Sequence, residues 1–89
     1  MEKFTIIWSK KASVQLTSLP FPIKKIIYSK VGELETNPYR KSVKKLRGVD
    51  SYRLRIGDYR VIFDIEKNEL RILILFLGDR KNVYKKFGL

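Results

Sequence analysis

The chain has 89 residues, and 44% of them are apolar, so we expect one domain spanning residues 1–89 with a small core. It contains no cysteine and no histidine, which excludes disulfides, thiolate metal sites and histidine-based acid–base catalysis. No apolar run approaches the length of a membrane span and no signal peptide is expected, so we expect a cytoplasmic protein.

Charge is the strongest compositional signal. Twenty Lys and Arg against nine Asp and Glu give a formal net charge of +11. Residues 40–60 carry eight basic and two acidic side chains, and residues 80–89 carry four basic and no acidic ones. A basic excess gathered in two short segments is typical of proteins that bind polyanions, although a generally lysine-rich surface is an alternative. We therefore expect nucleic acid, an acidic protein partner, or both.

The first half of the chain predicts a strand and two helices. Residues 4–8 are β-branched and aromatic, which favours a short strand, and Ser9 then offers an N-cap to the first helix. The prolines in residues 19–22 end that helix, and a second helix is expected to begin at Pro22 and to close at Asn37-Pro38. The predicted apolar stripe of the second helix comprises Ile23, Ile26, Ile27, Val31 and Leu34.

The second half predicts a three-stranded meander. After a polar, basic connection at residues 39–50, residues 52–56 and 59–65 alternate in polarity around a two-residue Gly57-Asp58 loop. Beyond a turn at Lys67-Asn68, residues 70–77 are apolar at nearly every position, which predicts the central strand. The expected fold is therefore α+β: a small antiparallel-rich sheet with a helical hairpin on one face and a short C-terminal tail or helix.

The predicted hairpin loop also determines which residues face each other. It places Arg55 directly opposite Arg60, and it puts both on the same face as Arg53. Opposed like charges destabilise an antiparallel pair, so we expect an anion to bind there, the alternative being a solvated face whose charges splay apart. The opposite face is predicted to form the core with Tyr52, Leu54, Ile56, Tyr59, Val61 and Phe63.

Other charged residues are interpreted by the same reasoning. A loop at Lys67-Asn68 places Asp64 opposite Arg71, which predicts an ordinary cross-strand ion pair. Arg80 follows the last strand and is expected near the hairpin tip, and Tyr84 could cover the arginine face or serve only as a packing aromatic. Because a guanidinium fork matches phosphate oxygens, we interpret the arginine face as a phosphate-binding site.

The residues that are absent narrow the possible reactions. The nine acidic residues are scattered, unlike the clustered carboxylates of a two-metal nuclease, and there is no glycine-rich phosphate loop. We therefore expect no metal and no other cofactor. Metal-free phosphodiester cleavage is easiest on RNA, whose 2′-hydroxyl can be the nucleophile, with arginines stabilising the developing charge and aligning the phosphate.

Three segments resemble the RelE/ParE superfamily of bacterial and archaeal toxins. They are residues 45–48 (Lys-Leu-Arg-Gly), residues 52–63 (Tyr-Arg-Leu-Arg-Ile-Gly-Asp-Tyr-Arg-Val-Ile-Phe) and residues 78–84 (Gly-Asp-Arg-Lys-Asn-Val-Tyr). The resemblance implies the microbial RNase-like α+β fold of that superfamily. RelE-type members are ribosome-dependent interferases that cleave messenger RNA in the A site and are inhibited by a small cognate antitoxin.

The resemblance also implies roles for five residues. Arg53 would stabilise the phosphate, Arg55 would take the place of the general base, and Arg60 would hold the transition-state charge. Arg80 would protonate the leaving 5′-oxygen, and Tyr84 would stack on or position the nucleotide. Lysines and an arginine of the two basic segments are expected to bind the RNA backbone: Lys41, Lys44, Lys45, Arg47, Lys81 and Lys85.

This chain departs from the family pattern at three positions. The best-studied members have lysines at the positions of Arg53 and Arg55, and arginine keeps its proton past pH ~12, so it is a poor base. Many relatives have histidine at the position of Asp79. Either the ribosome supplies the base or catalysis is mainly electrostatic, and a ParE-like DNA gyrase inhibitor or a non-catalytic RNA-binding relative is the alternative function.

The partners that the resemblance implies are messenger RNA, the ribosome and an acidic, RelB-like antitoxin in a toxin–antitoxin hetero-oligomer. An amphipathic segment of the antitoxin could dock in an apolar groove between the helical hairpin and the sheet edge, or could cover the basic face. No membrane partner is expected.

Overall fold

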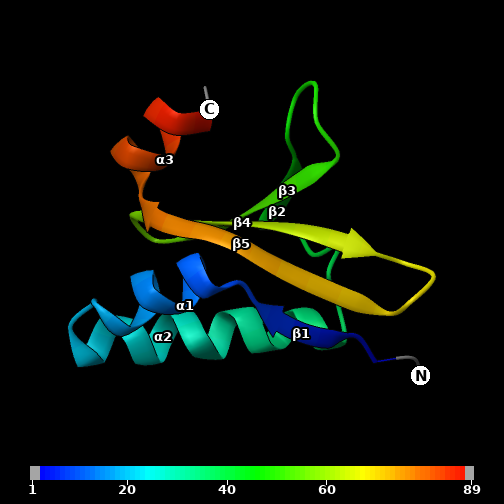
Figure 1. The fold of residues 1–89 in the computed structure, drawn as a ribbon, viewed down its shortest axis with the longest axis horizontal. Coiled ribbons are helices and arrows are strands. Elements are labelled where there is room, and N and C mark those ends of the chain that lie inside the picture. Colours follow the sequence, from blue (N-terminus) through cyan, green and yellow to red (C-terminus); the bar gives the residue numbers. More distant parts are fainter. Residues whose placement is uncertain (1–2, 88–89) are drawn as a thin grey trace.

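The computed structural model describes residues 3–87; residues 1–2 and 88–89, which the predicted domain includes, lie outside the described residues (Figure 1). The elements in chain order are β1 (Thr5–Trp8), α1 (Lys10–Thr17), α2 (Phe21–Gly32), a 3-10 turn (Glu33–Glu35), β2 (Val43–Lys45), β3 (Ser51–Ile56), β4 (Tyr59–Glu66), β5 (Arg71–Asp79) and α3 (Arg80–Phe87). Within this part of the chain, no helix is long and apolar enough to cross a membrane.

The strands form one mixed sheet in the order β1-β5-β4-β3-β2. β1 runs parallel to β5, and the other neighbours are antiparallel, which confirms the predicted α+β class. The prediction that residues 70–77 form the central strand is wrong, because β4 occupies the middle and β5 lies between β1 and β4. β5 is nevertheless apolar along its length because elements pack against both of its faces.

The two faces of the sheet are covered unequally. Figure 1 shows α1 and α2 on one side of the sheet and α3 on the other. The first side holds the main core, in which Phe63, Ile27 and Leu54 are fully buried. On the other side, α3 covers only part of the sheet with a small cluster of Leu46, Ile62, Phe76, Val83 and Phe87.

The helices begin close to where the sequence predicts. Ser9 is the N-cap of α1, and its hydroxyl accepts a hydrogen bond from the Ala12 amide at 3.0 Å. α2 begins at Phe21, one residue before the predicted Pro22, and gives way to the 3-10 turn after Gly32. The predicted apolar stripe is wrong at Ile26, whose side chain is 54% exposed.

The β3–β4 hairpin has the predicted register. Arg55 is paired with Arg60, Leu54 with Val61 and Tyr52 with Phe63. Gly57 adopts a φ of +56°, a conformation that glycine takes without the steric cost of a side chain. The alternating pattern therefore puts Leu54 and Val61 in the main core, as expected.

The β4–β5 register differs from the prediction. The turn spans residues 67–70 and brings Leu70 to a φ of +54°, so Arg71 faces Glu66 and binds its carboxylate at 2.7 Å. Asp64 faces Leu73 and accepts a hydrogen bond from the Ser51 hydroxyl. The predicted Asp64–Arg71 pair is therefore wrong, because the turn is longer than two residues.

Residues 39–50 were expected to form a connection, but they contain β2, which pairs with β3 at the sheet edge. In this pairing Val43 faces Leu54 and Lys44 faces Arg53. The strand is only three residues long, so it has no recognisable alternation in sequence.

Ser9→Ala should lower the free energy of unfolding by about 1–2 kcal/mol. The Ser9 hydroxyl both caps α1 and donates a hydrogen bond to the Leu75 carbonyl at 3.2 Å, so the substitution removes a cap and a link to β5. Urea denaturation measures the change, with Ser13→Ala on the exposed side of α1 as the matched control. Equal effects of the two substitutions would contradict this account of the cap.

Candidate nucleic-acid interface

The predicted arginine site forms a cavity of about 340 Å³. The structure brings together all five of the residues proposed for catalysis there, and Val83 completes the lining. These five residues are Arg53 and Arg55 from β3, Arg60 from β4, and Arg80 and Tyr84 from α3. Tyr84 lines this cavity and is 61% exposed, which leaves its ring available for stacking.

The position of Arg80 follows from the junction between β5 and α3. The Arg80 amide donates a hydrogen bond to the Asp58 carbonyl at 2.7 Å, which ties the start of α3 to the hairpin loop. The Asp79 carboxylate accepts a hydrogen bond from the Asn82 amide at 2.9 Å and so caps the first turn of the same helix. Asp79 therefore has a structural role in placing Arg80.

Arg60 is the most constrained of the four arginines. It is only 8% exposed, and one guanidinium nitrogen donates to the carbonyls of Gly57 at 2.8 Å and Tyr59 at 2.9 Å. Burial lowers the pKa of Arg60, the neighbouring charges of Arg53, Arg55 and Arg80 lower it further, and Asp58 opposes the shift. A bound anion would offset this repulsion and stabilise the charged guanidinium.

The four arginines have no carboxylate partner among residues 3–87. The ion pairs of this part of the chain join Lys3 to Glu35, Lys30 and Arg40 to Glu33, Lys45 to Asp50, and Arg71 to Glu66. Within the same residues, the Arg53 Nε atom is buried without a hydrogen-bond partner, which is costly for a charged donor. The site is therefore a cluster of cations available to an external anion.

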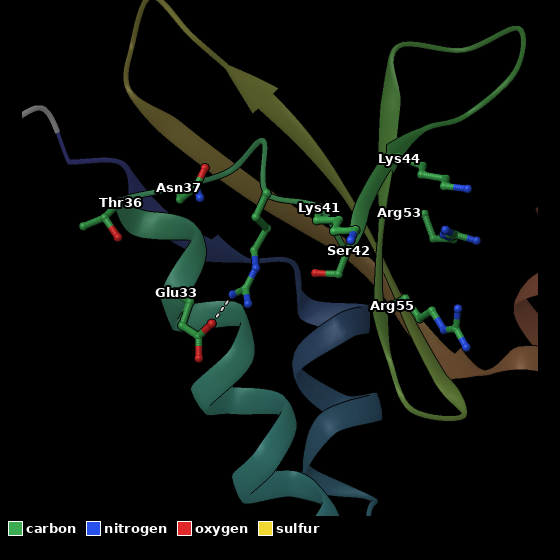
Figure 2. Close-up of a pocket in the computed structure, with 9 residues that line it drawn as sticks. Glu33, Thr36, Asn37, Lys41, Ser42, Lys44, Arg53 and Arg55 are labelled. Carbon is green, nitrogen blue, oxygen red and sulfur yellow. Dashed lines mark hydrogen bonds and ion pairs between the residues drawn. The ribbon is translucent and has the colours of Figure 1, made fainter.

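A larger cavity of about 780 Å³ adjoins the arginine site and shares Arg53 and Arg55 with it (Figure 2). Two of the predicted RNA-binding residues, Lys41 and Lys44, line this cavity. Lys45, Arg47, Lys81 and Lys85 line neither of these two cavities. Lys45 is bound to Asp50 at 3.4 Å, and the other three are exposed.

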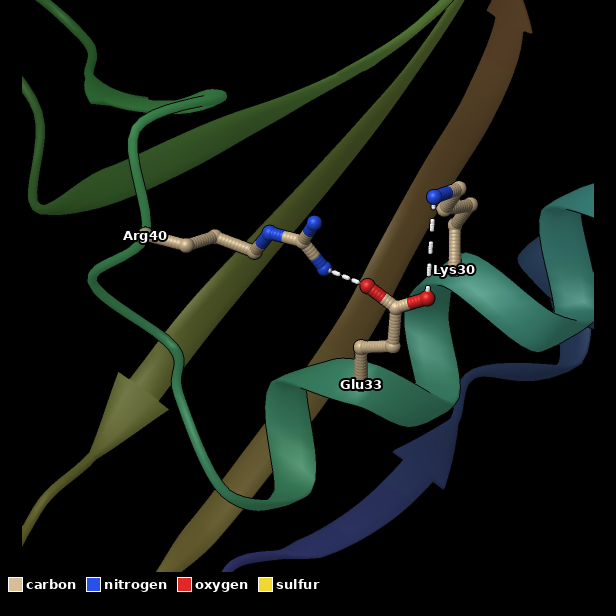
Figure 3. A network of polar contacts seen from close by, with 3 residues as sticks. All are labelled: Lys30, Glu33 and Arg40. Atoms are coloured by element: carbon tan, nitrogen blue, oxygen red, sulfur yellow. Dashed lines mark hydrogen bonds and ion pairs between the residues drawn. The ribbon is translucent and has the colours of Figure 1, made fainter.

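Sequence reasoning missed the other residues that line the larger cavity. Glu33 lies at one end of it, with its carboxylate bound by Arg40 and Lys30 (Figure 3). The hydrogen bond from Arg40 is the largest cause that lowers the pKa of Glu33, so this carboxyl group stays ionised. The remaining missed residues are Thr36, Asn37, Arg40 and Ser42, and the available signal was that polar residues lead into the basic segment.

An apolar groove lies on the opposite face of the sheet. It has a volume of about 200 Å³ and is lined by residues of α2 and of the β3–β4 hairpin: Ile23, Ile26, Ile27, Ile56, Gly57, Asp58 and Tyr59. Phe21 and Tyr28 of α2 are also exposed but do not line this groove, and Tyr28 stacks on Trp8 of β1 instead. A groove therefore lies between the helical hairpin and the sheet.

Among residues 3–87, no group of three or more acidic side chains is close enough together to hold a metal ion. The charged surface around β3 and the hairpin loop is instead dominated by arginine and lysine. This arrangement suits phosphate groups, because guanidinium groups can bind two phosphate oxygens at once.

Comparison with known proteins places the chain in a family. The model of the ParE toxin of type II toxin–antitoxin systems, parDE, matches residues 6–84. A curated relative from Methanocaldococcus jannaschii, named as a candidate toxin, RelE1, is 32% identical over 87 residues, which cover 93% of this chain and 97% of that protein.

Solved structures agree with this match. A chain of the RelBE2 toxin–antitoxin complex from Mycobacterium tuberculosis has a TM-score of 0.79 at 25% identity, covering 88% of this chain and 99% of that one. A chain of the archaeal RelE–RelB complex from Pyrococcus horikoshii OT3 has a TM-score of 0.78 at 32% identity, covering 88% and 96%. The chain therefore belongs to the ParE toxin family of type II toxin–antitoxin systems, within the RelE/ParE superfamily.

Proposed function

We propose that this toxin is a ribosome-dependent, metal-independent endoribonuclease that cleaves translated messenger RNA in the A site. The observation that carries the proposal is the cavity in which Arg53, Arg55, Arg60 and Arg80 meet without a carboxylate partner among residues 3–87. A toxin that only blocks another protein has no evident need for this cluster. Four converging cations suit a phosphodiester that gains negative charge during reaction.

The proposed reaction uses the RNA's own 2′-hydroxyl as the nucleophile. Its oxygen attacks the adjacent phosphorus and loses a proton, the bond to the 5′-oxygen breaks, and that oxygen gains a proton. The products are a 2′,3′-cyclic phosphate and a 5′-hydroxyl end. The arginines stabilise the charge on the non-bridging oxygens and hold the phosphate in line with the attacking oxygen.

The geometry suggests how the arginines divide this work. Arg60 is buried and fixed by the hairpin carbonyls, so it offers a rigid charge to the phosphate. Arg53 and Arg55 approach from the neighbouring strand, and Arg80 from the start of α3, where it can protonate the leaving oxygen. Tyr84 provides an exposed ring on which a base can stack.

Ribosome dependence is proposed because none of the residues that line the arginine site is a good base at neutral pH. Arginine holds its proton too tightly to remove one from a 2′-hydroxyl at neutral pH, and the chain has no histidine. We propose that the ribosomal A site supplies the base or orients the RNA so that a weak base suffices. Cleavage of free RNA should then be much slower than cleavage of translated RNA.

The proposed regulator is an acidic, RelB-like antitoxin that forms a hetero-oligomer with this toxin in the cytoplasm. Solved relatives of this chain are RelE–RelB toxin–antitoxin complexes. The net charge of +11 favours an acidic partner, and the groove beside Ile26 and Tyr59 offers an apolar dock for an amphipathic segment.

A ParE-like inhibitor of DNA gyrase is the second candidate, because the matching family model describes ParE toxins. Such an inhibitor would leave transcripts intact and would block the supercoiling of plasmid DNA by gyrase. Gel analysis of plasmid topoisomers, run beside the RNA assay, distinguishes the two functions.

Arg80→Ala should reduce cleavage of translated messenger RNA by about 100-fold or more, since one charged group is lost from the transition state. Primer extension on a transcript in a reconstituted translation system measures the cleavage. Arg71→Ala is the matched control, because Arg71 is bound to Glu66 and lies outside the cavity. Arg60→Ala is a poorer test because Arg60 also holds the hairpin carbonyls. Full cleavage by Arg80→Ala would contradict the proposed site.

A 2′-O-methyl group on the nucleotide before the cleaved bond should abolish cleavage at that bond, because it blocks the attacking oxygen. The same transcript with the methyl group two nucleotides away serves as the control and should be cleaved normally. Product ends are identified by their resistance to 3′-end ligation before removal of the cyclic phosphate. Cleavage at the methylated position would rule out 2′-hydroxyl attack.

A further inference from the structure

The larger cavity next to the arginine site is lined in part by the loop of residues 36–42, which several contacts hold in place. Arg40 of this loop binds Glu33 at the end of α2. The Ser42 carbonyl accepts a hydrogen bond from the Arg55 amide at 3.1 Å, and the Tyr39 ring packs edge-on against Tyr52 with centroids 6.3 Å apart. The loop is therefore held against the strand that carries the catalytic candidates, and its polar side chains have a defined position.

The cavity has one cationic wall. Lys44 on β2 faces Arg53 on β3, and Figure 2 shows the side chains of Lys44, Arg53 and Arg55 extending from the strands in the same direction, on the side away from Glu33. Lys41 adds a further charge from the loop. Because Arg53 and Arg55 also line the arginine site, this wall is continuous with the place proposed for the scissile phosphate.

The opposite end of the cavity has different chemistry. It is lined by Thr36, Asn37 and Glu33, which carry a hydroxyl, an amide and a carboxylate group. The neighbouring Arg40 and Lys30 keep this carboxylate ionised. An ionised carboxylate repels phosphate but accepts hydrogen bonds from the exocyclic amino group of a nucleobase, as amide and hydroxyl groups also can.

We propose that this cavity binds a whole nucleotide that flanks the scissile phosphate, with its own phosphate on the Lys41–Lys44 wall and its base toward Glu33 and Asn37. The volume of about 780 Å³ lies within the usual range of small-molecule sites. A free anion would contact only the cationic wall, whereas a nucleotide has a phosphate for this wall and a base for the end that carries Glu33. Glu33 favours a base with an amino group over uracil at this position.

The inference rests on the proposed function, because it assumes single-stranded RNA in the arginine site. The binding test uses a fluorescent 2′-O-methyl trinucleotide, which cannot be cleaved, and the matching mononucleoside 3′-phosphate. Lys41→Ala should weaken trinucleotide binding several-fold. It should also reduce the steepness with which the logarithm of the binding constant falls with the logarithm of the salt concentration by about 0.7, which corresponds to the loss of one phosphate contact to single-stranded RNA. Binding of the mononucleotide, which needs only the arginine site, should not change.

Lys25→Ala is the matched control, since Lys25 is an exposed lysine of α2 on the other side of the sheet. It removes the same charge from the chain without altering the cavity. Equal weakening by Lys25→Ala and Lys41→Ala would mean that only net charge matters, and it would overturn the inference. So would weakening of trinucleotide and mononucleotide binding to the same extent, or no binding of the trinucleotide by the unmodified chain.

The specificity test uses the cleavage reaction itself. Glu33→Gln should relax the base preference at the flanking position toward uracil, as measured by sequencing the 5′ ends of cleaved transcripts. Unchanged preference in Glu33→Gln would overturn the role of this carboxylate while leaving the proposed nuclease intact. Conversely, Lys41-dependent trinucleotide binding without any transcript cleavage would support the nucleotide site and refute the proposed reaction.

Discussion

Repulsion between guanidinium groups is the constraint around which this structure is arranged. Arg55 and Arg60 occupy opposed positions on neighbouring strands, where Cβ atoms lie about 5 Å apart, and Arg53 and Arg80 add charge to the same cavity. Burial of apolar residues such as Phe63 and Ile27 in the main core, on the other face, offsets the unfavourable free energy of this repulsion. A cluster held in this way would be pre-organised for the proposed phosphate, because the cost of bringing the cations together is met during folding.

The helix α3 contributes both to the stability of the fold and to the arginine site. Its Val83 and Phe87 side chains pack with Phe76 in the small cluster, and the same helix carries Arg80 and Tyr84 into the cavity. Lys11 and Lys86 both lie over the Phe76 ring, at 5.2 and 5.0 Å from its centroid, and Lys11 lowers the pKa of Lys86. Disturbance of this packing would therefore move residues of the cavity as well as reduce stability.

The two faces of the sheet have separate chemistry. The side covered by α1 and α2 presents an apolar groove beside Ile26. The side that carries α3 presents arginine and lysine along β2, β3 and α3. An apolar groove suits a protein segment and a cationic face suits a polyanion, so the proposed antitoxin and the proposed RNA substrate need not compete for the same contacts. Long-range attraction between an acidic partner and the net positive chain would still bring the two proteins together quickly.

Features that depend on residues close together in the sequence could be predicted from the sequence. Gly57-Asp58 determines the hairpin register because a two-residue loop leaves no freedom in pairing, and that register alone puts Arg53, Arg55 and Arg60 on one face. The β4–β5 register was not predictable in the same way, because Leu70 adopts a positive φ in a turn without glycine. The strand order, the edge strand β2 and the larger cavity depend on contacts between segments that are apart in sequence, such as β1 with β5 and Arg55 with Ser42. Sequence thus determined the charges and their alternation, whereas tertiary packing decided which of them share a cavity, because only folding brings the loop, the strands and α3 together.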